Sequence, residues 1–137
     1  MAKSILLPID YSDPKSWEKA LPVAREQAGF YGASLTILTV IPEILHLPNL
    51  PDNYGDGAAE HVKTKIKAIL VEQGCDDLKV EIRQGSVYRE ILKYAHAEKI
   101  EMIVIASAEG DFPNYEIGPN LARVVRNAHC SVLVIRD

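Results

Sequence analysis

The feature that most constrains the fold is a repeated alternation, along the chain, of short apolar segments with segments of helical periodicity. Residues 4–9 (SILLPI) and 102–106 (MIVIA) are almost continuously apolar, as is typical of strands buried on both faces. Residues 34–40 and 131–136 are rich in β-branched residues and predict two further strands. Residues 79–84 (KVEIRQ) alternate apolar and charged side chains, which predicts a strand with one face in water.

Four segments between these strands carry apolar residues at intervals of three and four, which predicts amphipathic helices. The first begins at Asp13, a capping residue before Pro14, and Pro22 inside it predicts either a kink or a first turn separate from the main helix. The second is predicted from about Ala58 and the fourth from Pro119. The predicted inward residues are Trp17, Ala20, Leu21, Ala24, Ala28 and Tyr31, then Val62, Ile66, Ile69 and Leu70, then Val87, Ile91, Leu92 and Ala95, and finally Leu121, Ala122, Val124, Val125 and Ala128.

Alternating strands and helices predict an α/β fold, a doubly wound five-stranded parallel sheet with helices on both faces, because parallel strands are joined by right-handed crossovers. The continuously apolar strands belong at the centre and the alternating strand, residues 79–84, belongs at an edge. With strands numbered along the chain, the predicted spatial order is 3-2-1-4-5. Residues 1–137 are expected to form a single domain.

The last strand begins at Ser131 and ends at Arg136, and its interior is uniformly apolar. At an open sheet edge such a strand invites pairing with another chain. We therefore expect a homodimer joined through residues 131–136.

Charge and hydropathy narrow the class of partner. The 137 residues carry a formal charge of −4, and the basic residues are spread along the chain rather than gathered in a stripe, so nucleic acid is not an expected partner. No segment approaches the roughly 20 apolar residues of a membrane-spanning helix, and none resembles a signal peptide. We expect no membrane association and a cytoplasmic location.

The predicted strand order places a binding site where the chain reverses direction, outside the carboxyl ends of strands one and four. Asp10 follows the first strand, Val40 ends the second, and Ala106, Ser107 and the loop to Gly118 follow the fourth. A carboxylate beside a small-residue loop that opens a helix suits a nucleotide, because the acid accepts from ribose hydroxyls and the helix N-terminus receives phosphate.

Structural roles remain open for the same residues. Asp10 could cap a helix or turn the chain, and Gly118 could be an ordinary helix-capping glycine. Arg123 and Arg126 are interpreted as the solvated face of the last helix rather than as a phosphate clamp. The histidines show neither metal-binding spacing nor a partner nucleophile, so we expect no metal site and no catalytic histidine. They are His46, His61, His96 and His129.

Four segments make the chain resemble the universal stress protein family over nearly its whole length: ILLPID, LTVIPE, QGSVYREI and IGPNLARVVRNAHCSVLVIR. The resemblance implies the 3-2-1-4-5 sheet, dimerisation through the C-terminal strand and, in one branch of the family, ATP or another adenine nucleotide at the switch point. By position, it implies that Asp10 contacts the ribose and that Val40 meets adenine through its backbone.

The phosphate motif of the nucleotide-binding branch runs G-x2-G-x9-G-S/T, and this chain departs from it. Ala106 and Glu109 stand at the first two glycine positions, the next gap is one residue shorter, and Pro119 replaces the hydroxyl residue after Gly118. Proline removes a hydroxyl and a backbone N–H from the anion cradle. The Asn120 amide and the backbone beyond it remain available as donors. The sequence Gly118-Pro119-Asn120, with the shorter loop before it, resembles a variant motif found among bacterial members of the family. For some of those members the resemblance implies a role in transporter regulation.

The sequence therefore predicts a regulatory homodimer that binds ATP or AMP, with Mg²⁺ only beside ATP, and that acts in a stress response or on a protein partner such as a transporter. The alternative is a protein-interaction module of the same fold that has lost nucleotide binding. An enzyme is not expected beyond slow ATP hydrolysis, because Ser12 stands where an aspartate-based phosphatase carries its second aspartate. No Walker lysine is present beside it.

Residues 42–57 (PEILHLPNLPDNYGDG) form a long connection with three prolines and little periodicity. They predict either a lid beside the cleft or an inert excursion.

Overall fold

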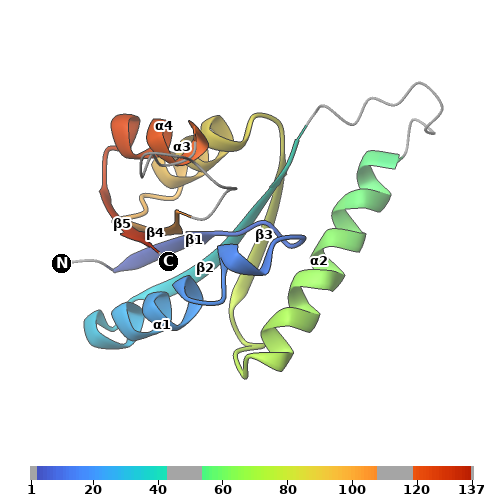
Figure 1. The fold of residues 1–137 in the computed structure, drawn as a ribbon, viewed down its shortest axis with the longest axis horizontal. Helices are drawn as coiled ribbons and strands as arrows, with labels where there is room; N and C mark the ends of the chain where they lie inside the picture. The colour runs from blue at the N-terminus through green and yellow to red at the C-terminus, as the bar shows by residue number, and fades with distance from the viewer. Residues whose placement is uncertain (1–2, 43–53, 108–118, 137) are drawn as a thin grey trace.

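The structure, a computed structural model, describes residues 3–42, 54–107 and 119–136. Five parallel strands form a sheet of order β3-β2-β1-β4-β5 (Figure 1), which confirms the predicted doubly wound α/β fold. The strands are β1 (Ser4–Pro8), β2 (Ser34–Ile41), β3 (Lys79–Gln84), β4 (Met102–Ala106) and β5 (Ser131–Ile135).

Helices cover both faces of this sheet. Figure 1 shows α1 (Ala20–Tyr31) and α2 (Tyr54–Glu72) on one face, and α3 (Val87–Ala97) and α4 (Pro119–Asn127) on the other. Neighbouring residues of one strand enter opposite cores, since strand side chains alternate in direction. Ile5 and Leu7 join the core under α1 and α2, whereas Leu6 joins the core under α3 and α4, and all three are fully buried. The central strands are thus buried on both faces, as their apolar sequences predict.

The first helical segment is divided. Asp13 caps a short 3₁₀ turn, Pro14–Ser16, by accepting from the Lys15 backbone N–H at 3.1 Å. The α-helix α1 begins at Ala20, so Pro22 lies in its first turn, where a backbone N–H has no partner inside the helix. Of the two predictions for Pro22, the separate first turn is therefore correct.

Two predicted helix features are wrong. The helix α2 begins at Tyr54, four residues before the predicted start at Ala58. Val125, predicted to point inward, is 45% exposed, because the buried stripe of α4 is narrow and follows Leu121 and Val124.

The charged face of β3 is also less exposed to solvent than predicted. Glu81 and Arg83 are half-buried, and only Lys79 and Gln84 are exposed. The Arg83 guanidinium lies 5.1 Å from the centre of the Tyr94 ring of α3, which covers this part of the strand. Within the described ranges, no helix is long and apolar enough to cross a bilayer.

Candidate functional site

A cleft of about 720 Å³ opens at the carboxyl ends of β1, β2 and β4. This is the point at which the sheet order reverses between β1 and β4, the position at which doubly wound sheets bind ligands. The volume lies within the range of small-molecule sites. Most of its lining is apolar, with Val40, Val87, Ile91 and Ile105 among the side chains.

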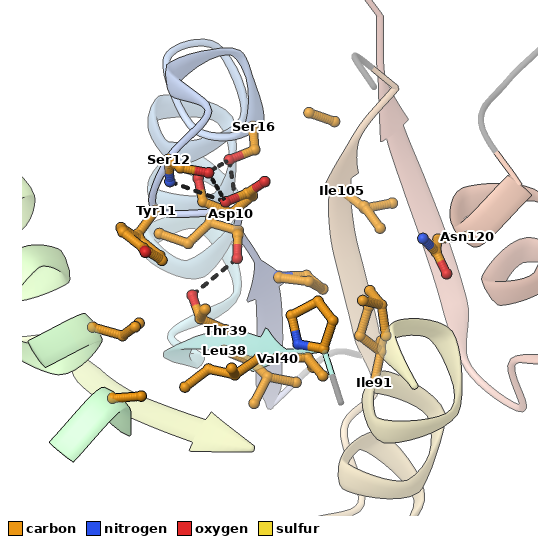
Figure 2. Close-up of a pocket in the computed structure, with 18 of the residues that line it drawn as sticks. Asp10, Tyr11, Ser12, Ser16, Leu38, Thr39, Val40, Ile91, Ile105 and Asn120 are labelled. Atoms are coloured by element: carbon orange, nitrogen blue, oxygen red, sulfur yellow. Dashed lines mark hydrogen bonds between the residues drawn. The ribbon is translucent and has the colours of Figure 1, made fainter. Parts of the chain in front are cut away.

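The Asp10 loop forms one wall of the cleft (Figure 2). Asp10 Oδ1 accepts from the Ser12 backbone N–H at 2.9 Å and from Ser12 Oγ at 2.7 Å. The Asp10 backbone N–H donates to Ser16 Oγ at 2.9 Å, which ties the loop to the 3₁₀ turn. Among the described residues Oδ2 makes no hydrogen bond, and the side chain is exposed. One carboxylate oxygen therefore fixes the loop and the other can accept from a ligand.

Strand β2 holds this loop in place. Pro8 pairs with Leu38, so β2 continues three residues past the last residue of β1. In that extension the buried Thr39 hydroxyl donates to the Ile9 carbonyl at 2.9 Å, and the Ile9 N–H donates to the Leu38 carbonyl at 2.9 Å. These two bonds hold Asp10 beside Val40 at the rim of the cleft.

The opposite wall comes from the other half of the sheet. Figure 2 shows Ile105 of β4, Ile91 of α3 and Asn120 of α4 across the cleft from Asp10. Because α4 begins at Pro119, Asn120 and Leu121 belong to its first turn, whose backbone N–H groups have no partner inside the helix and favour an anion. The cleft thus has a carboxylate on one wall and a helix N-terminal turn on the other.

The structure brings together four of the predicted site residues. Asp10, Val40, Ala106 and Asn120 line the cleft. Ser107 and Pro119, the chain neighbours of Ala106 and Asn120, are not among its lining residues. The Ser107 backbone N–H donates to the Ile135 carbonyl at 2.9 Å and so extends the pairing of β4 with β5.

Two sequence predictions lie outside the described residues. These are Gly118 with Glu109 in the phosphate loop, and the part of the predicted lid at residues 43–53. The end of the predicted lid segment belongs to α2, where Gly57 and Ala58 line the cleft.

Sequence reasoning missed several cleft residues. Tyr11, Ser16 and Thr39 line it together with Asp10, and His61 of α2 lines it as well. No sequence signal marks Thr39, which reads as an ordinary β-branched strand residue. Elsewhere, His96 and His129 meet with ring centres 5.8 Å apart. In the part of the chain that the structure describes, no three His, Cys, Asp or Glu side chains gather as metal ligands would.

The sequence profile of the universal stress protein family matches residues 1–136. The chain belongs to this family. Universal stress protein G of Shigella flexneri is 25% identical over 145 aligned positions, which cover 99% of this chain and all of that protein. Among solved structures, the universal stress protein UspA of Lactobacillus plantarum is 26% identical with a TM-score of 0.74, and the match covers 98% of each chain. Another similar structure is a universal stress protein in complex with cAMP, 18% identical, with a TM-score of 0.66 over 98% of this chain and 97% of that one. At that identity the likeness concerns the fold.

Proposed function

We propose that this family member is a regulatory homodimer that binds an adenine nucleotide, ATP or AMP, in the cleft at the switch point of the sheet. The observation that carries the proposal is the pair of opposed walls. The Asp10 carboxylate lies on one wall and the first turn of α4 on the other, in a cleft of about 720 Å³. A neighbour of the same fold has been solved in complex with cAMP, which is itself an adenine nucleotide.

In this proposal the adenosine half lies against β1 and β2. Asp10 Oδ2 accepts from a ribose hydroxyl, and the Val40 backbone meets the adenine edge at the end of β2. The apolar side chains of Ile91 and Ile105 cover the faces of the base.

The phosphate half lies between the end of β4 and the first turn of α4. Ala106 and Ser107 bound it, while Pro119 leaves the Asn120 amide and later backbone N–H groups as donors. Mg²⁺ accompanies ATP alone. With Ser12 in place of a second carboxylate, hydrolysis is slow at most, so the role is regulatory.

The wider setting of the proposal is a cytoplasmic, single-domain protein that pairs through β5 (Ser131–Ile135) with a second copy of itself. It acts in a stress response or on a protein partner such as a transporter, without nucleic acid or membrane as a ligand.

Calorimetry with adenosine, AMP and ATP tests the adenosine half. Asp10→Asn keeps an oxygen for Ser12 but replaces the free acceptor with an N–H₂ group, so affinity for all three ligands should fall about ten- to hundredfold. Asp13→Asn is the matched control, because it keeps the cap on the 3₁₀ turn and does not line the cleft. Equal affinities of the parent and Asp10→Asn for the three ligands would show that Asp10 does not contact the nucleotide.

Pro119→Ser tests the phosphate half and separates the alternative function. Restoring a hydroxyl and a backbone N–H should tighten ATP binding by about tenfold and leave adenosine unchanged. If the parent binds no adenine nucleotide at millimolar concentration and Pro119→Ser restores none, the protein-interaction module that has lost nucleotide is the better account.

A further inference from the structure

Two arginines gather on one tyrosine where α3 packs against α4. Arg89 Nε donates to Tyr88 Oη at 2.9 Å, and the Arg89 guanidinium carbon lies 5.6 Å from the Tyr88 ring centre. The Arg123 guanidinium carbon of α4 lies 4.8 Å from the same ring centre. Residues 34 positions apart in the sequence thus place two positive charges around one aromatic side chain.

No carboxylate of the described residues neutralises these charges. Within residues 3–42, 54–107 and 119–136, neither guanidinium forms an ion pair with an acidic side chain, and both arginines are exposed. The Tyr88 ring offers its face to both cations, which offsets part of their mutual repulsion. The hydrogen bond from Arg89, together with the charge of Arg89 and the nearby Arg123, lowers the pKa of Tyr88, so the cluster favours negative charge at this position.

The cluster lies close to the cleft along the chain. Tyr88 directly follows Val87, which lines the cleft from α3. Arg123 lies one turn after Asn120, which lines the cleft from α4. Positions three apart share a face of a helix, so Arg123 continues the face of α4 that Asn120 presents to the cleft. The cluster is not part of the cleft lining, but it follows the cleft residues Val87 and Asn120 along α3 and α4.

We propose that Arg89 and Arg123, held on Tyr88, form a subsite for a phosphate oxyanion. Planar guanidinium groups donate in a fork that matches phosphate oxygens, and both retain unused N–H donors. The inference rests on the proposed function in one respect, since the phosphate belongs to a nucleotide whose adenosine half occupies the cleft. The arginines then supply donors that Ala106 and Pro119 do not. Free polyphosphate has the same chemistry and is the second source.

The test compares ATP with adenosine in calorimetry. Arg123→Gln and Arg89→Gln should each weaken ATP binding about ten- to hundredfold and leave adenosine binding unchanged, because only ATP carries the oxyanion. Arg126→Gln is the matched control, an exposed arginine of α4 that makes no contact with Tyr88. Tyr88→Phe removes the hydroxyl that orients Arg89 and should weaken ATP by a smaller factor. Thermal melting of each variant checks that the fold is retained.

Tripolyphosphate, used alone, separates failure of this inference from failure of the proposed function. If the parent binds neither adenosine nor ATP but binds tripolyphosphate, and Arg123→Gln weakens it, the nucleotide function is wrong and the subsite stands for free polyphosphate. If adenosine and ATP bind but Arg123→Gln and Arg89→Gln leave ATP unchanged, the subsite is wrong and the nucleotide function stands. Loss of adenosine binding in Arg123→Gln would also overturn the subsite, because it would show a general disturbance of α4. No binding of any of the three probes would overturn both.

Discussion

The two edges of the sheet are built from opposite kinds of residue. Edge strand β3 carries Lys79, Glu81 and Arg83 on one face, and Glu81 pairs with Arg83 at 2.9 Å and with Lys79 at 3.5 Å. Edge strand β5 carries aliphatic side chains on both faces and no charge between its first and last residues. A charged edge resists the addition of another strand, whereas an apolar one accepts it. The sheet therefore has one edge, β3, that resists pairing with another strand and one edge, β5, that favours it.

The degree of cover follows the same division. The interior residues of β4 are buried, but those of β5, one strand further out, are only half-buried. Leu133 packs toward the core under α1 and α2, and Val134 packs toward the core under α3 and α4. Both cores thus extend to β5. The exposed parts of its half-buried aliphatic side chains provide the apolar surface for the proposed homodimer.

The largest expected effect comes from charging the β5 edge. Val132→Lys combined with Val134→Lys should convert a dimer into a monomer, with the dimer dissociation constant raised by about 100-fold or more, because like charges would face each other across the two-fold axis. Sedimentation or light scattering at micromolar concentration measures this.

The matched control is Gln84→Lys, which adds charge at an exposed position of β3 and should leave the oligomeric state unchanged. Since Val132 and Val134 are half-buried, a thermal melt must show that the double variant remains folded. A monomeric parent, or a dimer that both lysines leave intact, would contradict the proposed interface.

A second prediction compares packing at the two edges. Leu133 of β5 and Ile82 of β3 are both half-buried and both pack against the core under α1 and α2. Ile82→Ala should lower the free energy of unfolding by about 1–2 kcal/mol, and Leu133→Ala by about 2–4 kcal/mol if a second copy completes its burial. Urea unfolding measures both. In the Val132→Lys, Val134→Lys background the two costs should become equal, and a persistent difference would mean that no second copy covers Leu133.

The architecture could be predicted because its signals are local. The continuous apolar run at residues 4–9 and the alternation at residues 79–84 each depend only on neighbouring residues, and together they fix which strand is central and which is at an edge. Asp10 and Val40 could be placed at the cleft because each directly follows or ends such a strand.

Contacts between distant segments gave no such signal. The hydrogen bond from Thr39 to Ile9 joins residues 30 apart, and a threonine in a β-branched strand does not reveal it. Arg123 is exposed, as predicted, but nothing in α4 alone indicates that Tyr88 of α3 lies against it. The early start of α2 at Tyr54 was hidden by Gly55 and Gly57, which lower helix propensity.

The third prediction concerns the aromatic cover of β3. A double-mutant cycle with Arg83→Gln and Tyr94→Leu should give a coupling free energy of about 0.5–1 kcal/mol, since the guanidinium lies 5.1 Å from the ring centre. Chemical unfolding of the four proteins measures it. A value indistinguishable from zero would mean that Tyr94 covers this strand by packing alone.

The smallest expected effect is the pH dependence of the charged edge. Burial alone would raise the pKa of Glu81, but the hydrogen bond from Arg83 and the charges of Arg83 and Lys79 outweigh it and lower the pKa below its ordinary value of 4.5. A carboxyl group whose pKa is lower in the folded state stabilises that state above the unfolded pKa, and the contribution is lost as the pH falls through the folded value. Glu81→Gln should therefore cost about 0.2–1 kcal/mol at pH 7, a small amount because the pair is partly solvated, with side chains 26% and 40% exposed. Unfolding measured from pH 7 downward should show the two proteins converging once the pH falls below 4.5, whereas a constant difference would mean that Glu81 stabilises β3 by packing and not by charge.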